Sequence, residues 1–265
     1  MIYNLKSKNY CKFKVFEDNK LPARGYFIPF SSELKAVNAA PQDRRYISDK
    51  VRCLNGIWDF AYFKNYKEFP KILDTSKIAF DRIQVPSVWQ ALGYEPPFYV
   101  NGKYPFPVTP PKIPTKDSTG TYKEDINGTE YACGRKQYNS KGVYRTFFRI
   151  DDLNKRYILS FLGVAPCVEV YINGRYVGYS EGSHNTAEFN IDSYIQPGEN
   201  ELVAVVHKWC NGSYLEDQDM FRHNGIFRDV LLFANEPSYI YDFSFVPIKK
   251  GDKYDAAVTV RVNNF

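Results

Sequence analysis

The sequence predicts an all-β protein whose main part is an antiparallel β-sandwich of the jelly-roll type. It contains 22 Tyr and 20 Phe, residue types that are enriched in strands. Its 16 Gly and 16 Pro interrupt the chain at short intervals, as in a fold of many short strands joined by tight turns. Several stretches alternate apolar and polar residues, which is the period of a strand with one buried face. With 265 residues, the chain is long enough for one or two domains with a sizeable core.

Residues 1–50 are predicted to form an extended N-terminal arm that packs against the next domain. Prolines at 22, 29 and 41 interrupt this stretch, and it shows little sustained periodicity. The net charge of +5 is concentrated here, because Lys6, Lys8, Lys12 and Lys14 all precede Glu17. We expect this basic end to be a solvated tail. The rest of the chain shows no basic stripe, so nucleic-acid binding is not expected.

Residues 51–235 are predicted to form the jelly-roll domain. Its first strand follows an Asn-Gly turn signal and places Trp58, Phe60 and Tyr62 on one face. Asn173 and Gly174 form a two-residue hairpin turn between two later strands. The number and spacing of the strands are typical of a jelly roll. The further strands are expected at 142–149, 157–162, 167–172, 175–179, 187–191 and 203–209.

Residues 236–265 repeat the strand pattern. Strands are expected at 239–247 and 254–262, with a turn at Lys250, Gly251 and Asp252. A lone hairpin buries too little surface to be stable by itself. This region is therefore predicted to be the beginning of a second β-sandwich, which stops in mid-domain.

Cysteine usage and the N-terminus predict a cytoplasmic protein. The five cysteines, at 11, 53, 133, 167 and 210, show no close pairing and are odd in number. We interpret them as reduced packing residues, with a zinc site as the weaker alternative. The chain begins without the apolar run of a signal peptide and contains no stretch long enough to span a membrane.

The acidic segment, residues 211–230, is the first candidate for a functional site. It combines carboxylates, arginines, His223 and aromatic residues around the string Glu216-Asp217-Gln218-Asp219. In an extended backbone, Asp217 and Asp219 would point to the same side, where they could hold a cation or bind the hydroxyls of a polar ligand. A solvated turn between two strands is the alternative. For His223 we favour a supporting role.

The proline-rich loop, residues 93–114, is the second candidate. It contains seven prolines and five aromatic residues, with the polar Asn101 near its centre. Aromatic rings can contact the C–H face of a pyranose, and an amide can bridge sugar hydroxyls because it both donates and accepts hydrogen bonds. The alternative is a stiff loop that only caps the edge of the sandwich. Residues 116–141 are polar and are interpreted as a surface insertion.

These stretches resemble the N-terminal part of bacterial β-galactosidases of glycoside hydrolase family two. The resemblance rests on SYLEDQDM followed by GIFRDV, on LNGIWDF, on VPSVWQ and on YVNGKYP. It implies a galactose-binding-domain-like jelly roll followed by an incomplete immunoglobulin-like domain. It also implies that Asn101 contacts galactose and that Asp219 contacts galactose and a sodium ion. Sodium, magnesium and homo-oligomerisation are expected of the parent enzyme.

No catalytic residue is expected in this chain. A retaining glycosidase needs an acid/base and a nucleophile, two carboxyl groups about 5 Å apart. In the resembling family both lie in a (β/α)₈ barrel of about 250 residues. This sequence shows no alternation of strands and helices. We therefore expect an inactive fragment of an enzyme that hydrolyses β-D-galactosides such as lactose with retention, and its partners would be the missing C-terminal domains.

Two alternatives remain open at this point. The first is a free-standing carbohydrate-binding module without catalytic activity. The second is the same fragment of a β-glucuronidase or a β-mannosidase, since the sandwich is shared across the family.

Overall fold

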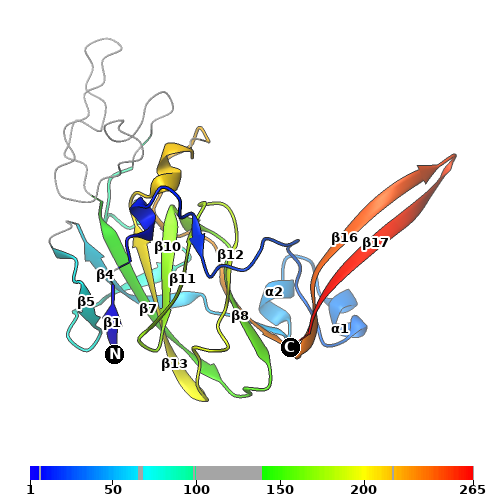
Figure 1. The fold of residues 1–265 in the computed structure, drawn as a ribbon, viewed down its shortest axis with the longest axis horizontal. Helices are drawn as coiled ribbons and strands as arrows, with labels where there is room; N and C mark the ends of the chain where they lie inside the picture. Colours follow the sequence, from blue (N-terminus) through cyan, green and yellow to red (C-terminus); the bar gives the residue numbers. More distant parts are fainter. Residues whose placement is uncertain (6, 65–67, 98, 100–138, 217, 265) are drawn as a thin grey trace, which may run out of the picture.

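The fold consists of two packed antiparallel sheets with a separate hairpin at the C-terminal end (Figure 1). The computed structural model describes residues 1–265 except 6, 65–67, 98, 100–138, 217 and 265. The first sheet has seven strands in the order β2-β11-β10-β13-β7-β4-β6, and the second has four in the order β12-β8-β15-β3. Every strand pairing among the described residues is antiparallel. The predicted all-β antiparallel sandwich is therefore confirmed.

The strands of the two sheets come from most of the chain. The seven-stranded sheet comprises β2 (Glu17–Asp18), β4 (Gly56–Phe63), β6 (Asp81–Val85), β7 (Lys141–Ile150), β10 (Cys167–Ile172), β11 (Arg175–Glu181) and β13 (Gly198–His207). The four-stranded sheet comprises β3 (Val51–Cys53), β8 (Arg156–Phe161), β12 (Ala187–Asn190) and β15 (Val230–Asn235).

The main core lies between the inner faces of the two sheets. Trp58 and Phe60 on β4 face Phe161 on β8 and Phe189 on β12, and each of these four side chains is at most 1% exposed. Tyr62 packs against the same cluster, so the three aromatic residues predicted to share a face do so. Burying aromatic side chains of this size accounts for much of the stability of such a core.

The predicted hairpin turn at Asn173 and Gly174 is present. Both residues have positive φ, 50° and 81°, as a two-residue turn between strands of right-handed twist requires. The turn joins β10 to β11 and pairs Ile172 with Arg175.

Strand β15 has no counterpart among the predicted strands. The strand crosses the middle of the four-stranded sheet, and five of its six residues are buried. Its apolar run at 230–234 shows no alternation, and a run this short cannot be assigned to a strand or a helix by periodicity alone.

The N-terminal residues form a covering layer and not a free tail. Strand β1 (Ile2–Asn4) pairs with β5 (Ile72–Asp74), and a 3₁₀ helix, η1, spans Asn9–Cys11. Tyr3 and Tyr10 are buried against the outer face of the seven-stranded sheet, whereas Lys8 and Lys12 remain exposed. The expected solvated tail is thus wrong, because Tyr3 and Tyr10 fix the segment to the sheet.

The rest of the arm runs along the sandwich and includes two short helices, α1 (Glu33–Asn38) and α2 (Arg44–Ile47). Arg24 forms an ion pair with Glu188 on β12, with 2.7 Å between Nε and Oε2, and both side chains are less than 10% exposed. None of the helices in the described part of the chain has the length and apolar character needed to span a bilayer.

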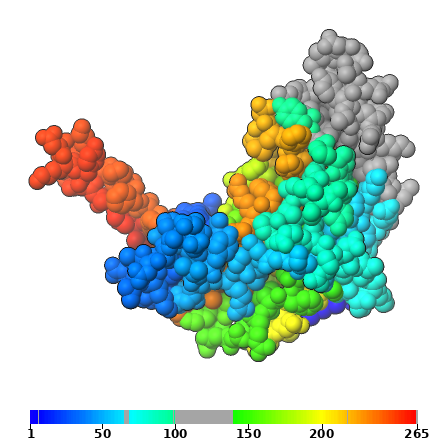
Figure 2. Space-filling model, turned by 180° about the vertical axis from the view of Figure 1, so that it is seen from behind, coloured from blue at the N-terminus to red at the C-terminus, as the bar shows by residue number. Residues whose placement is uncertain are grey.

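The C-terminal hairpin consists of β16 (Ser238–Lys250) and β17 (Lys253–Asn264) and projects from the sandwich (Figures 1 and 2). Both strands and the turn at Gly251 were predicted. Assigning this hairpin to an immunoglobulin-like domain stays a prediction, as do the domain boundaries at residues 50 and 235.

Gly225 joins the acidic segment to the core and is expected to tolerate no side chain. It has φ +120°, and a Cβ atom there would lie 2.9 Å from the Ser87 carbonyl oxygen and 3.0 Å from the Tyr144 hydroxyl. We predict that Gly225→Ala lowers the free energy of unfolding by about 3 kcal/mol, measured by chemical denaturation. Gly198→Ala is the control, since Gly198 has φ +85° but nothing within 4 Å, and it should cost about 1 kcal/mol. Equal losses in the two variants would contradict the role of the contacts at Gly225.

Candidate functional site

The acidic segment begins with a 3₁₀ helix, η3 (Asn211–Tyr214), which is attached to strand β11 through Glu181. The backbone N–H of Gly212 donates to Glu181 Oε2 at 2.7 Å, and Asn211 Nδ2 donates to Oε1 at 3.1 Å. The Tyr179 hydroxyl also donates to Glu181. Asn211 Nδ2 further contacts the Lys12 carbonyl oxygen at 2.9 Å, so the N-terminal layer is joined to the same point.

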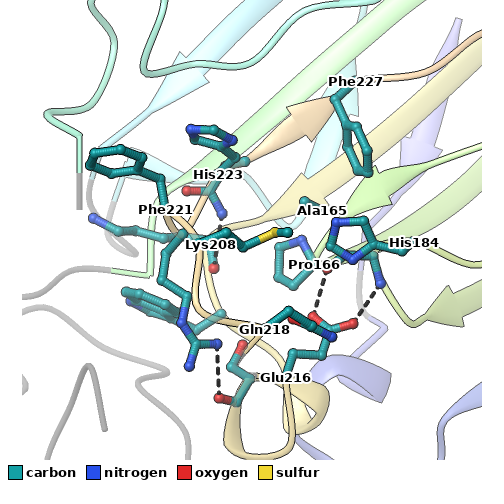
Figure 3. A pocket seen from close by; sticks show the side chains of 15 residues that line it. Ala165, Pro166, His184, Lys208, Glu216, Gln218, Phe221, His223 and Phe227 are labelled. Carbon is teal, nitrogen blue, oxygen red and sulfur yellow. Dashed lines mark hydrogen bonds between the residues drawn. The ribbon is translucent and has the colours of Figure 1, made fainter. Parts of the chain in front are cut away.

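Glu216, the first carboxylate of the acidic string, is bonded to the turn after β11. It accepts hydrogen bonds from the backbone N–H and the hydroxyl of Ser183, both at 2.6 Å (Figure 3). Two charge-assisted bonds of this length fix both side chains. Glu216 is therefore a structural residue, which a count of carboxylates in the sequence does not reveal.

Asp219 lies in an unusual backbone conformation and is bonded to Tyr99. Its φ of 52° is in the left-handed region, which Asp and Asn enter more readily than most residues. The Tyr99 hydroxyl donates to Asp219 Oδ1. This bond joins the proline-rich loop to the acidic segment, which are far apart in the sequence. The extended backbone assumed for this stretch in the sequence analysis is wrong at Asp219.

A row of aromatic side chains continues from Tyr99. The ring of Tyr99 meets Phe221 edge-on, with 5.8 Å between centroids and 65° between planes. Phe221 in turn lies parallel to His223, at 6.0 Å and 13°. Tyr99 is 42% exposed and Phe221 51% exposed, so neither ring is held in place by the core.

The VPSVWQ element is joined to the end of the acidic segment. Gln90 and Asn224 exchange two hydrogen bonds, Gln90 Nε2 to Asn224 Oδ1 at 2.9 Å and Asn224 N to Gln90 Oε1 at 3.0 Å. The backbone of Trp89 adds a bond to the Asn224 carbonyl oxygen at 2.9 Å. These two stretches also adjoin on the molecular surface, where orange residues near 220 meet teal residues near 90 (Figure 2).

A buried ion pair supports the start of the proline-rich loop. Lys208 Nζ lies 2.8 Å from Glu95 Oε2, and the two side chains are 10% and 9% exposed. Burial alone would raise the pKa of Glu95, but the charge of Lys208 and hydrogen bonds from Lys208, Tyr62 and Ser140 lower it below its usual value. Glu95 is therefore a carboxylate at neutral pH and holds the loop against the sheet.

A small hollow lies between the acidic segment and the ends of the strands (Figure 3). Its walls combine apolar side chains such as Pro166 and Phe227 with the polar side chains of Glu216 and Gln218. His184 borders it and meets Phe227 edge-on at 5.4 Å. His223 also lines the hollow, and its supporting role stays a prediction.

The structure brings together some of the predicted site residues and leaves others undescribed. Asp219 lies at the contact between the two candidate segments. Asn101, Asp217 and the part of the expected insertion up to residue 138 lie outside the described residues. Tyr99 and Glu181 were missed as site residues. No sequence period marks a contact between residues 120 positions apart, as Tyr99 and Asp219 are.

The described residues offer few ligands for a metal ion. No group of three or more His, Cys, Asp or Glu side chains with metal-binding geometry occurs among them. The four described cysteines are free thiols. The contact at Asp219 brings together one carboxylate and the Tyr99 hydroxyl, whereas hard cations take about six oxygen ligands. A metal ion bound here would need further ligands.

The fold and the site define a class of protein, an antiparallel β-sandwich module whose polar, aromatic-lined site is made by loops at one end. The model of the sugar-binding domain of glycosyl hydrolase family 2 matches residues 51–135 and 129–236. The chain therefore belongs to glycosyl hydrolase family 2.

Curated relatives in this family are β-galactosidases. The β-galactosidase of Actinobacillus pleuropneumoniae is 42% identical over 227 residues, which is 85% of this chain and 20% of the relative. That of Staphylococcus xylosus is 32% identical over 258 residues, 97% of this chain and 23% of the relative. The chain thus spans about one fifth of the length of the relatives it matches.

Solved structures of glycosidases share the fold at lower identity. A mutant of β-glucuronidase 2 from Bacteroides uniformis aligns with a TM-score of 0.53 at 17% identity, covering 81% of this chain and 22% of its own. A β-galacturonidase from Eisenbergiella tayi aligns with a TM-score of 0.51 at 16% identity, covering 81% of this chain and 30% of its own. These similarities support the sandwich fold alone.

The pKa of Glu181 leads us to predict that the stability of the protein depends on pH. Burial raises its pKa to about 7, from a usual value of 4.5, although the hydrogen bonds it accepts act in the opposite direction. The folded protein therefore keeps a proton on Glu181 at pH values where the unfolded chain has released it. Consequently, the free energy of unfolding contributed by this group falls as the pH rises from about 4.5 to about 7.

We expect Glu181→Gln to flatten this decline, measured by urea denaturation at several pH values. Glu188, which is paired with Arg24, offers a matched control, and Glu188→Gln should leave the decline in place. An unchanged pH profile in Glu181→Gln would contradict the raised pKa.

Proposed function

We propose that this chain supplies part of the galactose subsite of a β-galactosidase that hydrolyses β-D-galactosides such as lactose with retention. Asn101 and Asp219 are its proposed sugar-binding residues. The observation that carries the proposal is the hydrogen bond from Tyr99 to Asp219, which joins the YVNGKYP and LEDQDM strings. Asn101 follows Tyr99 by two residues, a separation that a chain spans in at most about 7 Å.

The surroundings of Asp219 suit a pyranose. Exposed rings of Tyr99 and Phe221 lie beside a carboxylate, so C–H faces and hydroxyl groups of a sugar would both find partners. Identity to β-galactosidases over most of the chain favours galactose over the uronic acids named for the structural relatives.

In this proposal the acid/base and the nucleophile come from the part of the β-galactosidase relatives that this chain does not match. Glu216 is bonded to Ser183 and Asp219 to Tyr99, so neither has the setting of a pair placed on opposite sides of a glycosidic bond. The chain alone would then be inactive.

The proposed sodium ion would be bound jointly. Asp219 would contribute one carboxylate, and residues outside this chain would complete the coordination. Magnesium, homo-oligomerisation and a cytoplasmic location are proposed only for the whole enzyme, by analogy with the family.

A chimera tests the proposal. The matching N-terminal region of the Actinobacillus pleuropneumoniae enzyme is replaced by this chain, and hydrolysis of a chromogenic β-galactoside is measured. We expect activity, and we expect Asn101→Ala and Asp219→Asn each to lower kcat/KM by about 10- to 100-fold, since each loses polar contacts to the sugar.

Asp252→Asn is the matched control, because Asp252 is exposed in the turn of the projecting hairpin, and it should leave kcat/KM unchanged. A folded chimera that hydrolyses a β-glucuronide and not a β-galactoside would overturn the choice of sugar. Full activity in both site variants would overturn the assignment of Asn101 and Asp219.

A further inference from the structure

We propose that Tyr99 is a positioning residue, which orients the carboxylate of Asp219 and couples the proline-rich loop to the acidic segment. The inference rests on the proposed function for its effect on sugar binding, but the contact itself can be tested without it. Tyr99 would act through Asp219 and not by bonding to the sugar.

The left-handed backbone conformation of Asp219 supports this role. At φ 52° the residue occupies a region that is unfavourable for a non-glycine residue, and such conformations persist where the surroundings determine them. The hydrogen bond from Tyr99 is a determinant of this kind, because a neutral hydroxyl bonded to a carboxylate is charge-assisted. Bonded at Oδ1, the carboxylate has one preferred orientation.

The rings of Tyr99 and Phe221 are placed by each other and not by the core. Tyr99 is 42% exposed and Phe221 51% exposed, so burial in the core does not explain where these rings lie. Their edge-on contact at 5.8 Å instead orients the Tyr99 ring, which directs its hydroxyl toward Asp219. This ring contact joins the two segments at a second point, because Phe221 follows Asp219 by two residues.

Both segments that meet at this contact are attached to the sandwich nearby. Glu95 at the start of the proline-rich loop is paired with Lys208, and Glu216 in the acidic segment is bonded to Ser183. Both attachments lie within four residues of the contact.

Hydrogen–deuterium exchange on the full chain tests the contact directly. In Tyr99→Phe we expect amides of residues 218–223 to exchange about tenfold faster, because one charge-assisted hydrogen bond is lost. Tyr94→Phe is the matched control. It removes a hydroxyl from the same loop, but its ring packs on Phe60 and Tyr62 and should leave exchange at 218–223 unchanged. Equal exchange in wild type and Tyr99→Phe would overturn the proposal.

A double-mutant cycle in the active chimera tests the effect on the sugar. We expect Tyr99→Phe to weaken inhibition by galactose about tenfold in the otherwise unchanged chimera. In the Asp219→Ala chimera, the same substitution should change inhibition less than about twofold. Additive losses would show that Tyr99 bonds to the sugar by itself and would overturn a positioning role. An equal loss in Tyr94→Phe would do the same, since it would point to general loosening of the loop.

The two proposals fail in different ways. An inactive but folded chimera would overturn the proposed function, and the exchange measurement would still decide whether Tyr99 orders Asp219. An active chimera with unaltered exchange in Tyr99→Phe would leave the function standing and remove the role of Tyr99.

Discussion

The rest of the molecule depends on the mutual burial of two sheets. Trp58 and Phe60 on one sheet and Phe161 and Phe189 on the other are covered only because the sheets face each other. Side chains that alternate along these strands must point either into this core or outward, so the inner face has no room for a polar site. The polar residues of the candidate site are consequently found at the end of the sandwich, on loops that the strands hold in place.

Such loops need fixed points, and in this chain carboxylates provide them. Glu181 accepts hydrogen bonds from Gly212 and Asn211, and Glu216 accepts two from Ser183. Glu95 pairs with Lys208 on the other side of the site. Buried or half-buried carboxylates are costly unless they are bonded, and here each bond also places a segment of the backbone. Acidic residues near a site therefore include several whose role is structural.

Asp219 differs from these three residues in its surroundings. It lies in a left-handed conformation beside exposed aromatic rings, and it accepts a hydrogen bond from Tyr99, which comes from the other loop. A strained residue at the meeting point of two loops is a common feature of binding sites. Galactose is the proposed sugar because the chain belongs to glycosyl hydrolase family 2 and is similar in sequence to β-galactosidases.

The sequence by itself determined the all-β class, most strands of the sandwich and the turn at Asn173 and Gly174, because alternation and turn chemistry are local properties. Its short strings also indicated the family. Only the tertiary structure decided that β15 is a strand, since its short apolar run shows no alternation, and that the N-terminal residues form a layer. The same holds for the site. Glu216 is bonded to Ser183 and Asp219 to Tyr99 through contacts between distant segments. Such contacts cannot be predicted from the local sequence.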